Sequence, residues 1–145
     1  MLREKSEKVI GAALRVHTAL GPGLLEATYQ GCLAAELRAS GHSASTQVAL
    51  PVRYGGLELD NGYRLDLLVD DEVIVEVKAV EKLTAVHQAQ LLTYLRLSER
   101  RVGLLINFCS VHLPDGIKRL VHSRWRPTRA ARLASPTPAT RRSPH

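Results

Sequence analysis

Asp66 is followed after nine residues by Glu76-Val77-Lys78, and the polar members of this set are of the types that carry out phosphoryl chemistry. Apolar and polar residues alternate on either side of an acidic turn between them, which predicts a β-hairpin. Two carboxylates that face each other repel unless a cation lies between them, and Mg²⁺ is the usual cation. A lysine beside them can orient or deprotonate a water, or neutralise charge on a phosphate. The pattern suggests a metal-dependent phosphodiesterase.

The hairpin needs an odd loop if Asp66 is to lie beside Glu76. Side chains alternate between the two faces of a strand, so the register decides which residues meet. Val69 must pair with Val73 across a three-residue loop, 70–72, because a two-residue turn would put the acids on opposite faces. We expect the odd loop, or a β-bulge that restores the parity. The core face would then consist of Leu65, Leu67, Val69, Val73, Val75 and Val77.

A simpler interpretation of the same hairpin needs no metal. Asp66 and Lys78 would then form a surface ion pair on the solvated face of a sheet. Strands with one wet face are common in antiparallel sheets, so the hairpin alone does not establish a catalytic site.

Charge divides the chain into two parts. Six of the 20 lysines and arginines, and none of the 14 acids, lie in residues 123–145, which leaves residues 1–122 without net charge. We therefore expect one domain over residues 1–122 and a basic tail, rich in proline and arginine, that is disordered. The tail could bind phosphates by counterion release, or could be a solubilising extension without a partner. The absence of net charge over residues 1–122 argues against a domain that binds duplex DNA over a broad surface.

The remaining composition points to a cytoplasmic protein. Nothing resembles a signal peptide, and the longest apolar runs fall far short of the ~20 residues that a membrane span needs. No membrane partner is therefore expected. Cys32 and Cys109 stand alone without a CxxC spacing, so neither a zinc site nor a disulfide framework is indicated.

Hydrophobic periodicity predicts a mixed α/β domain around a central sheet. Helices are expected over residues 6–20, 24–40 and 83–97, and strands over 48–54, 57–59, 102–108 and 117–121 in addition to the hairpin. Gly41 lies where a C-terminal helix cap belongs, and Pro51 indicates an irregular or edge strand.

Two of the expected helices carry polar residues that could join the site. On the second, Glu26, Tyr29 and Gln30 share one stripe with Leu33 and Leu37. A carboxylate at the head of a stripe that carries leucines should have a partner, such as a metal or a lysine, because burying it unpaired is costly. Alternatively, Glu26 only complements the helix dipole in the first turn.

On the third helix, His87, Gln90 and Tyr94 share a face. Their side chains can hydrogen-bond a phosphate, a base edge or the Glu76/Lys78 cluster. A lone histidine at such a place is more often a satisfied structural residue than a ligand. With Tyr29, these three residues are the candidates for substrate contact.

Four motifs in order along the chain resemble a known family. Residues 23–29 fit a Gly-x-x-Glu-x-x-Tyr signature, and the Asp66…Glu76-Val77-Lys78 core and Gln90-x-x-x-Tyr94 follow it. The chain resembles the GxxExxY proteins of the PD-(D/E)XK nuclease superfamily, and the Gln-x-x-x-Tyr element is similar to that of the RecB-like branch. Residues 103–108 resemble the late core strand of this family. The resemblance extends from about residue 6 to residue 121.

This resemblance implies a restriction-endonuclease-like αβββαβ core, a central mixed sheet flanked by helices. It implies that Asp66 and Glu76 bind Mg²⁺, for which Mn²⁺ can substitute, with the Val77 carbonyl as a third ligand. Lys78 would position or activate the attacking water. Glu26 would match the acidic residue that the superfamily often carries on its first core helix, where it helps to hold metal or water.

The resemblance also implies that Gln90 and Tyr94 touch the substrate backbone or order the site. The proline of the superfamily's proline-aspartate pair is absent, because Leu65 precedes Asp66; this variation is common in the superfamily.

The sequence thus favours a metal-dependent nuclease, with DNA as the favoured substrate. The alternative is a non-catalytic binding or regulatory module that keeps the nuclease fold and acts through a protein or nucleic-acid partner. A structure-specific nuclease that acts as a homodimer is a third arrangement. The low aromatic content argues against a base-stacking platform for single strands.

Overall fold

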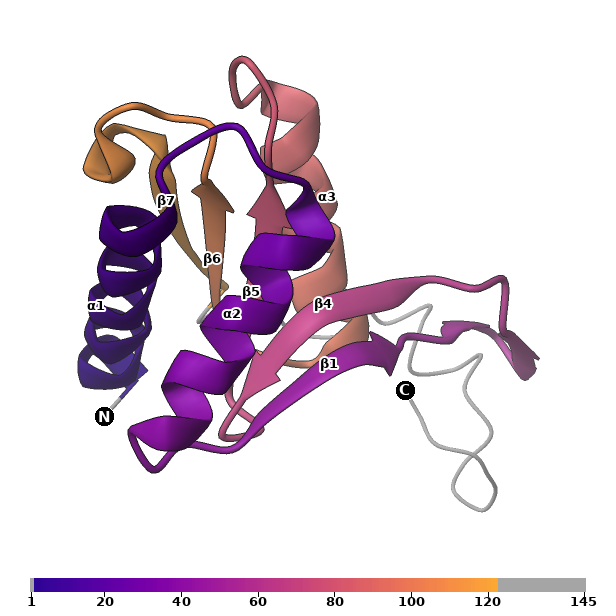
Figure 1. Cartoon of the computed structure of the whole chain (residues 1–145). Coiled ribbons are helices and arrows are strands. Elements are labelled where there is room, and N and C mark those ends of the chain that lie inside the picture. The colour runs from indigo at the N-terminus through magenta and orange to yellow at the C-terminus, as the bar shows by residue number, and fades with distance from the viewer. Residues whose placement is uncertain (1, 123–145) are drawn as a thin grey trace.

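The computed structural model describes residues 2–122 of the chain (Figure 1). The tail that the sequence predicts over residues 123–145 lies outside this range. The helices are α1 (Leu2–Leu20), α2 (Glu26–Ala39) and α3 (Ala85–Ser98), with a 3₁₀ helix η1 (Leu113–Gly116); the strands are β1 (Ala44–Ala49), β2 (Val52–Tyr54), β3 (Leu57–Leu59), β4 (Arg64–Val69), β5 (Val73–Lys78), β6 (Val102–Asn107) and β7 (Ile117–Val121).

Five strands form the central sheet, in the order β1-β4-β5-β6-β7. Neighbouring strands are antiparallel except β5 and β6, which are parallel and are joined by α3. A parallel pair needs such a crossover connection, and a helix commonly supplies it. The series α2, β1, β4, β5, α3, β6 is the αβββαβ order expected from the sequence. The mixed α/β fold is therefore confirmed.

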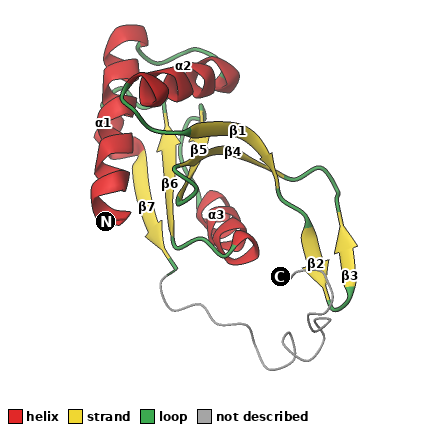
Figure 2. Ribbon diagram, turned by 90° about the horizontal axis from the view of Figure 1, so that it is seen from below, coloured by secondary structure: helices red, strands yellow, loops and turns green. Residues whose placement is uncertain are grey.

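Helices α1 and α2 lie on one side of the sheet and α3 on the other (Figure 2), and each side has an apolar core. On one face α1 and α2 pack against β4, β5 and β6 and form the α1/α2 core, which includes Val9, Ala13, Tyr29, Leu33, Leu67, Val75, Leu104 and Phe108. On the other face α3 forms the α3 core with Leu50, Leu65, Leu68, Ile74, Leu91, Tyr94, Leu95 and Leu105. Strands β5 and β6 are buried on both faces, in agreement with their nearly continuous apolar sequences.

The register of the predicted hairpin is confirmed. Val69 pairs with Val73, and the loop between them is residues 70–72. Asp70 and Asp71 both have positive φ, 52° and 59°, a conformation that aspartate tolerates better than most residues. The odd loop therefore brings Asp66 and Glu76 to opposite positions on the two strands.

The predicted face of Leu65 is wrong. The sequence places Leu65 on the same face as Leu67, but Leu67 packs in the α1/α2 core and Leu65 in the α3 core. Figure 2 shows β1 and β4 curving together around α3. The alternation of side chains breaks between these two leucines, at Asp66, because the strands bend there.

The strand expected over residues 48–54 is divided in two. Strand β1 starts earlier, at Ala44, and β2 begins only after Pro51. Proline has no N–H to give to a ladder, and Leu50 donates its own N–H to the Tyr63 carbonyl at 2.9 Å. The chain therefore leaves the central sheet at this point.

Strands β2 and β3 form a separate two-stranded sheet that projects from the body (Figure 2). Its end is open to solvent, with Tyr54 80 % exposed. Across the described residues, no helix combines the length and apolar character needed to cross a membrane.

Two of the helix boundaries have identifiable local causes. The third helix begins at Ala85 because Thr84 and His87 form a reciprocal capping box. The second ends before Gly41, whose φ is +92°, and the N–H groups of Gly41 and His42 bind the carbonyls of Arg38 and Leu37. The predicted role of Gly41 as the residue that ends the helix is confirmed.

Candidate active site

Asp66 and Glu76 connect β4 to β5 through their carboxylates. The main-chain N–H of Asp66 donates to Glu76 Oε2 at 3.0 Å, and the N–H of Val77 donates to Asp66 Oδ2 at 2.8 Å. The main-chain pairing of β4 with β5 extends from the Val69–Val73 pair to the Leu67–Val75 pair, which is next to these two acids. The carboxylates thus take the place of main-chain partners where the strands separate. One oxygen of each carboxylate is left outside these two hydrogen bonds.

The surroundings of Glu76 disfavour a charged carboxylate. Its side chain is only 4 % exposed. Burial, followed by the negative charge of Asp66, raises the pKa of Glu76 to about 8. Burial also raises the pKa of Asp66, although the Val77 N–H and the charge of Lys78 oppose the rise. Without a cation, the pair therefore keeps a proton near neutral pH.

Lys78 lies at the end of β5, within electrostatic reach of both carboxylates. Its positive charge opposes the rise in the pKa of Asp66 and of Glu76. The strand end is held by the Phe108 N–H, which donates to the Lys78 carbonyl at 2.9 Å. Main-chain pairing of Lys78 with Asn107 in the β5–β6 ladder adds to this. The two carboxylates and the ammonium are therefore within electrostatic reach of one another, and their shared catalytic role stays a prediction.

Asn107 fixes the segment that follows the site, and sequence reasoning did not single it out. Its side chain is buried, accepts the N–H of Val80 at 3.0 Å and donates to the carbonyl of Val80 at 2.9 Å. The signal in the sequence was a polar residue at the end of an otherwise apolar strand. A buried amide needs partners, and here Val80 supplies two of them while the Cys109 N–H donates to the same Oδ1 at 3.2 Å.

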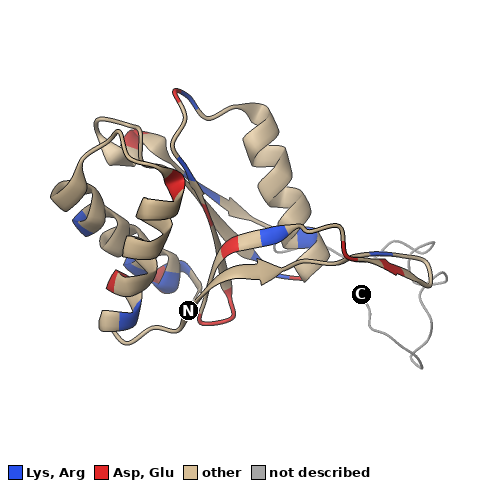
Figure 3. Cartoon of the chain, turned by 45° about the vertical axis from the view of Figure 1, so that its right-hand side comes forward, with Lys and Arg blue, Asp and Glu red and all other residues tan. Residues whose placement is uncertain are grey.

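Glu26 lies at the margin of the site, at the first position of α2. Its Oε2 accepts the N–H of Ala79, one residue beyond β5, at 3.0 Å. The partner is thus a main-chain amide, where the sequence suggested a metal or a lysine. The negative charge of Glu26 contributes to the raised pKa of Asp66, so the two carboxylates are within electrostatic reach. Figure 3 shows acidic and basic residues interspersed over the described elements.

Helix α3 brings one of its three polar candidates to the carboxylates. Tyr94 is 9 % exposed, and burial together with the negative charge of Glu76 raises its pKa. His87 uses Nδ1 to accept the N–H of Thr84 at 3.0 Å, which completes the capping box. Gln90 lies exposed on the surface of the helix. The predicted polar face is therefore divided between the site, a helix cap and solvent.

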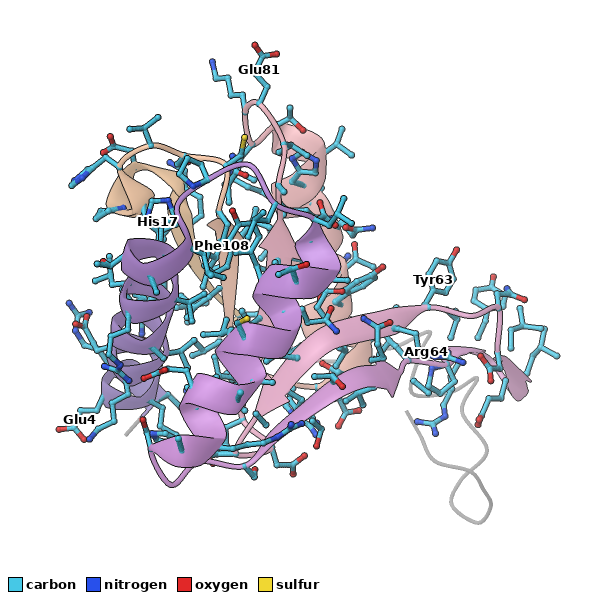
Figure 4. The ribbon with its side chains drawn as sticks, in the orientation of Figure 1. Glu4, His17, Tyr63, Arg64, Glu81 and Phe108 are labelled. Carbon is cyan, nitrogen blue, oxygen red and sulfur yellow. The ribbon has the colours of Figure 1, made fainter. Side chains whose placement is uncertain are left out.

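Tyr29 has a structural role. Its side chain is fully buried, its ring stacks on Phe108 with centroids 4.5 Å apart, and its hydroxyl donates to the Gly21 carbonyl and accepts the Leu24 N–H. Figure 4 shows Phe108 among the side chains between α1, α2 and the sheet. Direct contact of Tyr29 with substrate, one of the predictions, is not available in this conformation because the side chain has no exposed surface.

Gln47 on β1 is a neighbour of the site that sequence reasoning missed. Its neighbours Thr46 and Val48 pair with Leu67 and Leu65 on either side of Asp66, and Gln47 is among the groups that oppose the rise in the pKa of Asp66. Its Nε2 also donates to Gln30 Oε1 at 2.9 Å. Nothing in an exposed glutamine on an edge strand distinguishes it in the sequence, because its role depends on which residue pairs across the ladder.

The donor set of the site suits Mg²⁺. No group of three or more His, Cys, Asp or Glu residues in residues 2–122 is arranged to hold a metal, so the candidate ligands are two carboxylates and main-chain oxygen. Mg²⁺ usually binds through one or two carboxylates and keeps several waters. The mutual repulsion of Asp66 and Glu76 is what a divalent cation would relieve. The residues present fit such an ion.

Comparison with known proteins assigns the chain to a family. The family model for the PD-(D/E)XK nuclease superfamily matches residues 3–120, which is most of the chain and nearly all of its described part. Neither the curated proteins nor the solved structures yield a match. The family match covers the helices, the central sheet and the site together. The chain therefore belongs to the PD-(D/E)XK nuclease superfamily.

Proposed function

We propose that the protein is a metal-dependent nuclease that hydrolyses phosphodiester bonds, with DNA as the favoured substrate. The observation that carries this proposal is the Asp66–Glu76 pair beside Lys78. The half-buried Asp66 and the buried Glu76 share a proton near neutral pH, and a perturbed pair of this kind is a candidate functional site. It is well suited to exchanging that proton for a divalent cation.

In this proposal Asp66, Glu76 and the Val77 carbonyl hold Mg²⁺, and Mn²⁺ can substitute. The chemistry that the ion supplies when bound is neutralisation of charge on the phosphoryl oxygen and acidification of a coordinated water. Lys78 orients the attacking water and stabilises negative charge that develops on the phosphate. The protein's own contribution is therefore positioning and electrostatics, the main requirements of phosphoryl transfer.

The remaining candidates are assigned by where they lie. Glu26 holds the end of β5 through the Ala79 N–H and adds negative charge at the margin of the site. Tyr94 lies within electrostatic reach of Glu76 on the α3 side of the sheet. Gln90 is accessible for contact with the substrate backbone. His87 contributes by fixing the start of α3, which carries the other two residues.

A non-catalytic module is the second candidate, and the absence of net charge over residues 1–122 favours it. A domain that grips nucleic acid by counterion release is usually basic. If the protein is a nuclease, a homodimer would extend the binding surface beyond that of one neutral protomer. The basic residues of the tail would offer further phosphate contacts.

The deciding experiment is cleavage of a panel of duplex, single-stranded and branched DNA and of RNA, with Mg²⁺ or Mn²⁺ against EDTA. Lys78→Ala is assayed beside Lys82→Ala, which removes an exposed lysine from the loop after β5. We expect metal-dependent cutting that Lys78→Ala abolishes and Lys82→Ala retains. No cutting of any substrate by the folded wild type would reject the nuclease and favour the non-catalytic module.

A further inference from the structure

The two-stranded sheet of β2 and β3, residues 52–59, is an arm with one apolar face. Its ladder consists of the residue pairs Val52–Leu59, Arg53–Glu58 and Tyr54–Leu57. Paired residues lie on the same face of a ribbon, and consecutive pairs alternate between its two faces. The first and third pairs therefore form a face that is entirely apolar. The second pair lies on the other face, where Arg53 Nε donates to Glu58 Oε1 at 3.0 Å.

The apolar face of the arm is uncovered. Tyr54 is 80 % exposed, Leu57 is 54 % exposed and Leu59 is 39 % exposed, whereas Val52 is partly buried. None of these four residues belongs to the α1/α2 core or to the α3 core of the described residues. A two-stranded ribbon without a packed face is marginally stable at best, and contiguous exposed apolar surface marks interaction sites. This face is therefore one that a partner should cover.

The charges of the arm do not fit a nucleic-acid backbone. Proteins contact phosphates mainly through lysine and arginine side chains. The apolar face of the arm has neither, and on the opposite face Arg53 is paired with Glu58. Where the arm joins β4, Arg64 lies 3.6 Å from Asp60. An uncharged surface on a second protein molecule is the better match for the apolar face.

Helix α3 offers an uncharged surface on this same chain. Residues 83–95 contain no Asp, Glu, Lys or Arg. The side of α3 that faces away from the α3 core is formed mainly by Ala85, Val86, Ala89, Leu92 and Thr93. Val86 is 75 % exposed, although the outer face of a surface helix is normally polar or charged. Figure 3 shows α3 without acidic or basic residues over most of its length, and Figure 2 shows it on the same side of the central sheet as the arm.

We propose that the partner is a second copy of this chain, and that the arm of each protomer packs its apolar face on the outer face of α3 of the other. Such a pairing has two-fold symmetry and makes two equal contacts, so both uncharged surfaces of each protomer are buried at once. A stable interface commonly takes about 20–30 residues from each partner. One arm of residues 52–59 is too small for this, whereas the two-fold pairing brings an arm and a helix from each protomer.

Sedimentation equilibrium of the full chain measures this association. Leu57→Glu places a charge on the arm and Val86→Lys places one on α3. Val111→Lys is the matched control, at an apolar position in the loop after β6 that is 86 % exposed. We expect the wild type and Val111→Lys to be dimers. Each of the other two variants should weaken the dimer at least about 100-fold, because it would bury an unpaired charge. A monomeric wild type, or an unweakened dimer in either variant, would overturn the proposal.

Mixing Leu57→Glu with Val86→Lys tests which surfaces meet. In the mixed dimer one contact is wild type, and in the other the introduced glutamate meets the introduced lysine. The mixture should therefore regain the dimer that neither variant forms alone, which also shows that both variants are folded. No recovery, with both variants folded by circular dichroism, would reject the pairing of the arm with α3.

The measurement is made in EDTA without nucleic acid, so its result does not depend on the nuclease assignment. Duplex DNA is then added to the wild type and to Leu57→Glu. If the wild type is monomeric and binds duplex DNA, and Leu57→Glu does not, nucleic acid covers the arm and the proposal fails.

Discussion

The carboxylate of Glu26, the first residue of α2, accepts the N–H of Ala79, which lies one residue beyond β5. This hydrogen bond joins two parts of the chain that are 53 residues apart and ties the helix to the end of the strand that carries Glu76 and Lys78. The helix and the strand are otherwise connected through the α1/α2 core. The position of Lys78 therefore depends partly on the Glu26 side chain.

Replacement of Glu26 should reduce activity through this hydrogen bond. Glu26→Gln keeps an oxygen that can accept the Ala79 N–H, whereas Glu26→Ala removes it. We expect Glu26→Ala to lower kcat about 10- to 100-fold and Glu26→Gln to lose less. Because Glu26 is exposed, both variants should keep the thermal stability of the wild type to within about 1 kcal/mol.

Steady-state kinetics beside thermal unfolding checks this prediction. If both variants lost the same amount of activity, the charge of Glu26, and not its hydrogen bond, would be what matters at the site. Wild-type activity in both variants would contradict any role of Glu26.

The metal-free protein should lose stability as the pH rises. Folding raises the pKa of Glu76 from 4.5 to about 8, so between these values the folded state binds more protons than the unfolded state. The free energy of unfolding must then fall with pH, with a slope of at most about 1.4 kcal/mol per pH unit for each proton. The stabilisation is complete below about pH 4.5 and is lost as the pH passes 8.

Chemical denaturation in EDTA at a series of pH values measures this slope. Glu76→Gln should flatten the profile, whereas Glu81→Gln, which changes an exposed loop residue, should leave it unchanged. Mg²⁺ should stabilise the wild type more at pH 8 than at pH 5.5, because the cation replaces the proton. A wild-type profile as flat as that of Glu76→Gln would contradict the raised pKa.

The hairpin that carries the site could be predicted because its register is determined by residues that are close together in the sequence. Side chains in a strand alternate with period two, so the requirement that two acids share a face determines that the loop is odd. The structure has this register, with Val69 paired to Val73. The location of Asp66, Glu76 and Lys78 on one hairpin was thus available from the sequence.

The neighbours of the site could not be predicted, because their partners are distant or are main-chain atoms. Glu26 binds an amide that every non-proline residue possesses, so no side chain in the sequence indicates the contact. The place of Gln47 depends on the ladder between β1 and β4 and on a bend at Asp66. That bend also moved Leu65 to the α3 core, against the simple alternation. Interactions of this kind appear only after the elements have packed.

Asp70 lies in the loop between β4 and β5, at the end of these strands that is opposite the site. We expect it to control the stability of the protein at acid pH. Burial alone would raise its pKa, but hydrogen bonds from His42, Ser43 and Lys5 outweigh burial and lower the pKa to about 2. The folded state therefore binds fewer protons than the unfolded state between about pH 2 and the ordinary value of 3.8. The stabilisation is complete above pH 3.8 and is lost as the pH falls through 2.

Asp70→Asn should remove most of this acid dependence and cost about 1–2 kcal/mol near neutral pH, because it loses the charge that binds these donors. Denaturation at pH 6 and pH 3 measures both effects. Asp115→Asn, at an exposed position of η1, is the matched control. If Asp70→Asn were as stable as the wild type at pH 6, the contacts of Asp70 would not contribute to folding.

Gly103 on β6 should be required for the close approach of α3. A Cβ atom built at this position lies 2.9 Å from Leu91 Cδ1 and 3.1 Å from Leu91 Cγ. Leu91 is fully buried in the α3 core, so its side chain has little room to move. Gly103→Ala should therefore destabilise the fold by about 1–3 kcal/mol through overpacking. The same displacement would shift Tyr94, one turn along α3, relative to Glu76.

A second substitution tests whether the clash with Leu91 is the cause. Leu91→Val removes one methylene, so alone it should destabilise by about 1 kcal/mol, but in Gly103→Ala it should restore stability. Denaturation of the two single variants and the double variant gives the coupling between the positions. Additive losses would show that the chain accommodates the added methyl group by moving atoms other than those of Leu91. A favourable coupling would instead locate the packing constraint that sets the distance between α3 and the sheet beneath the site.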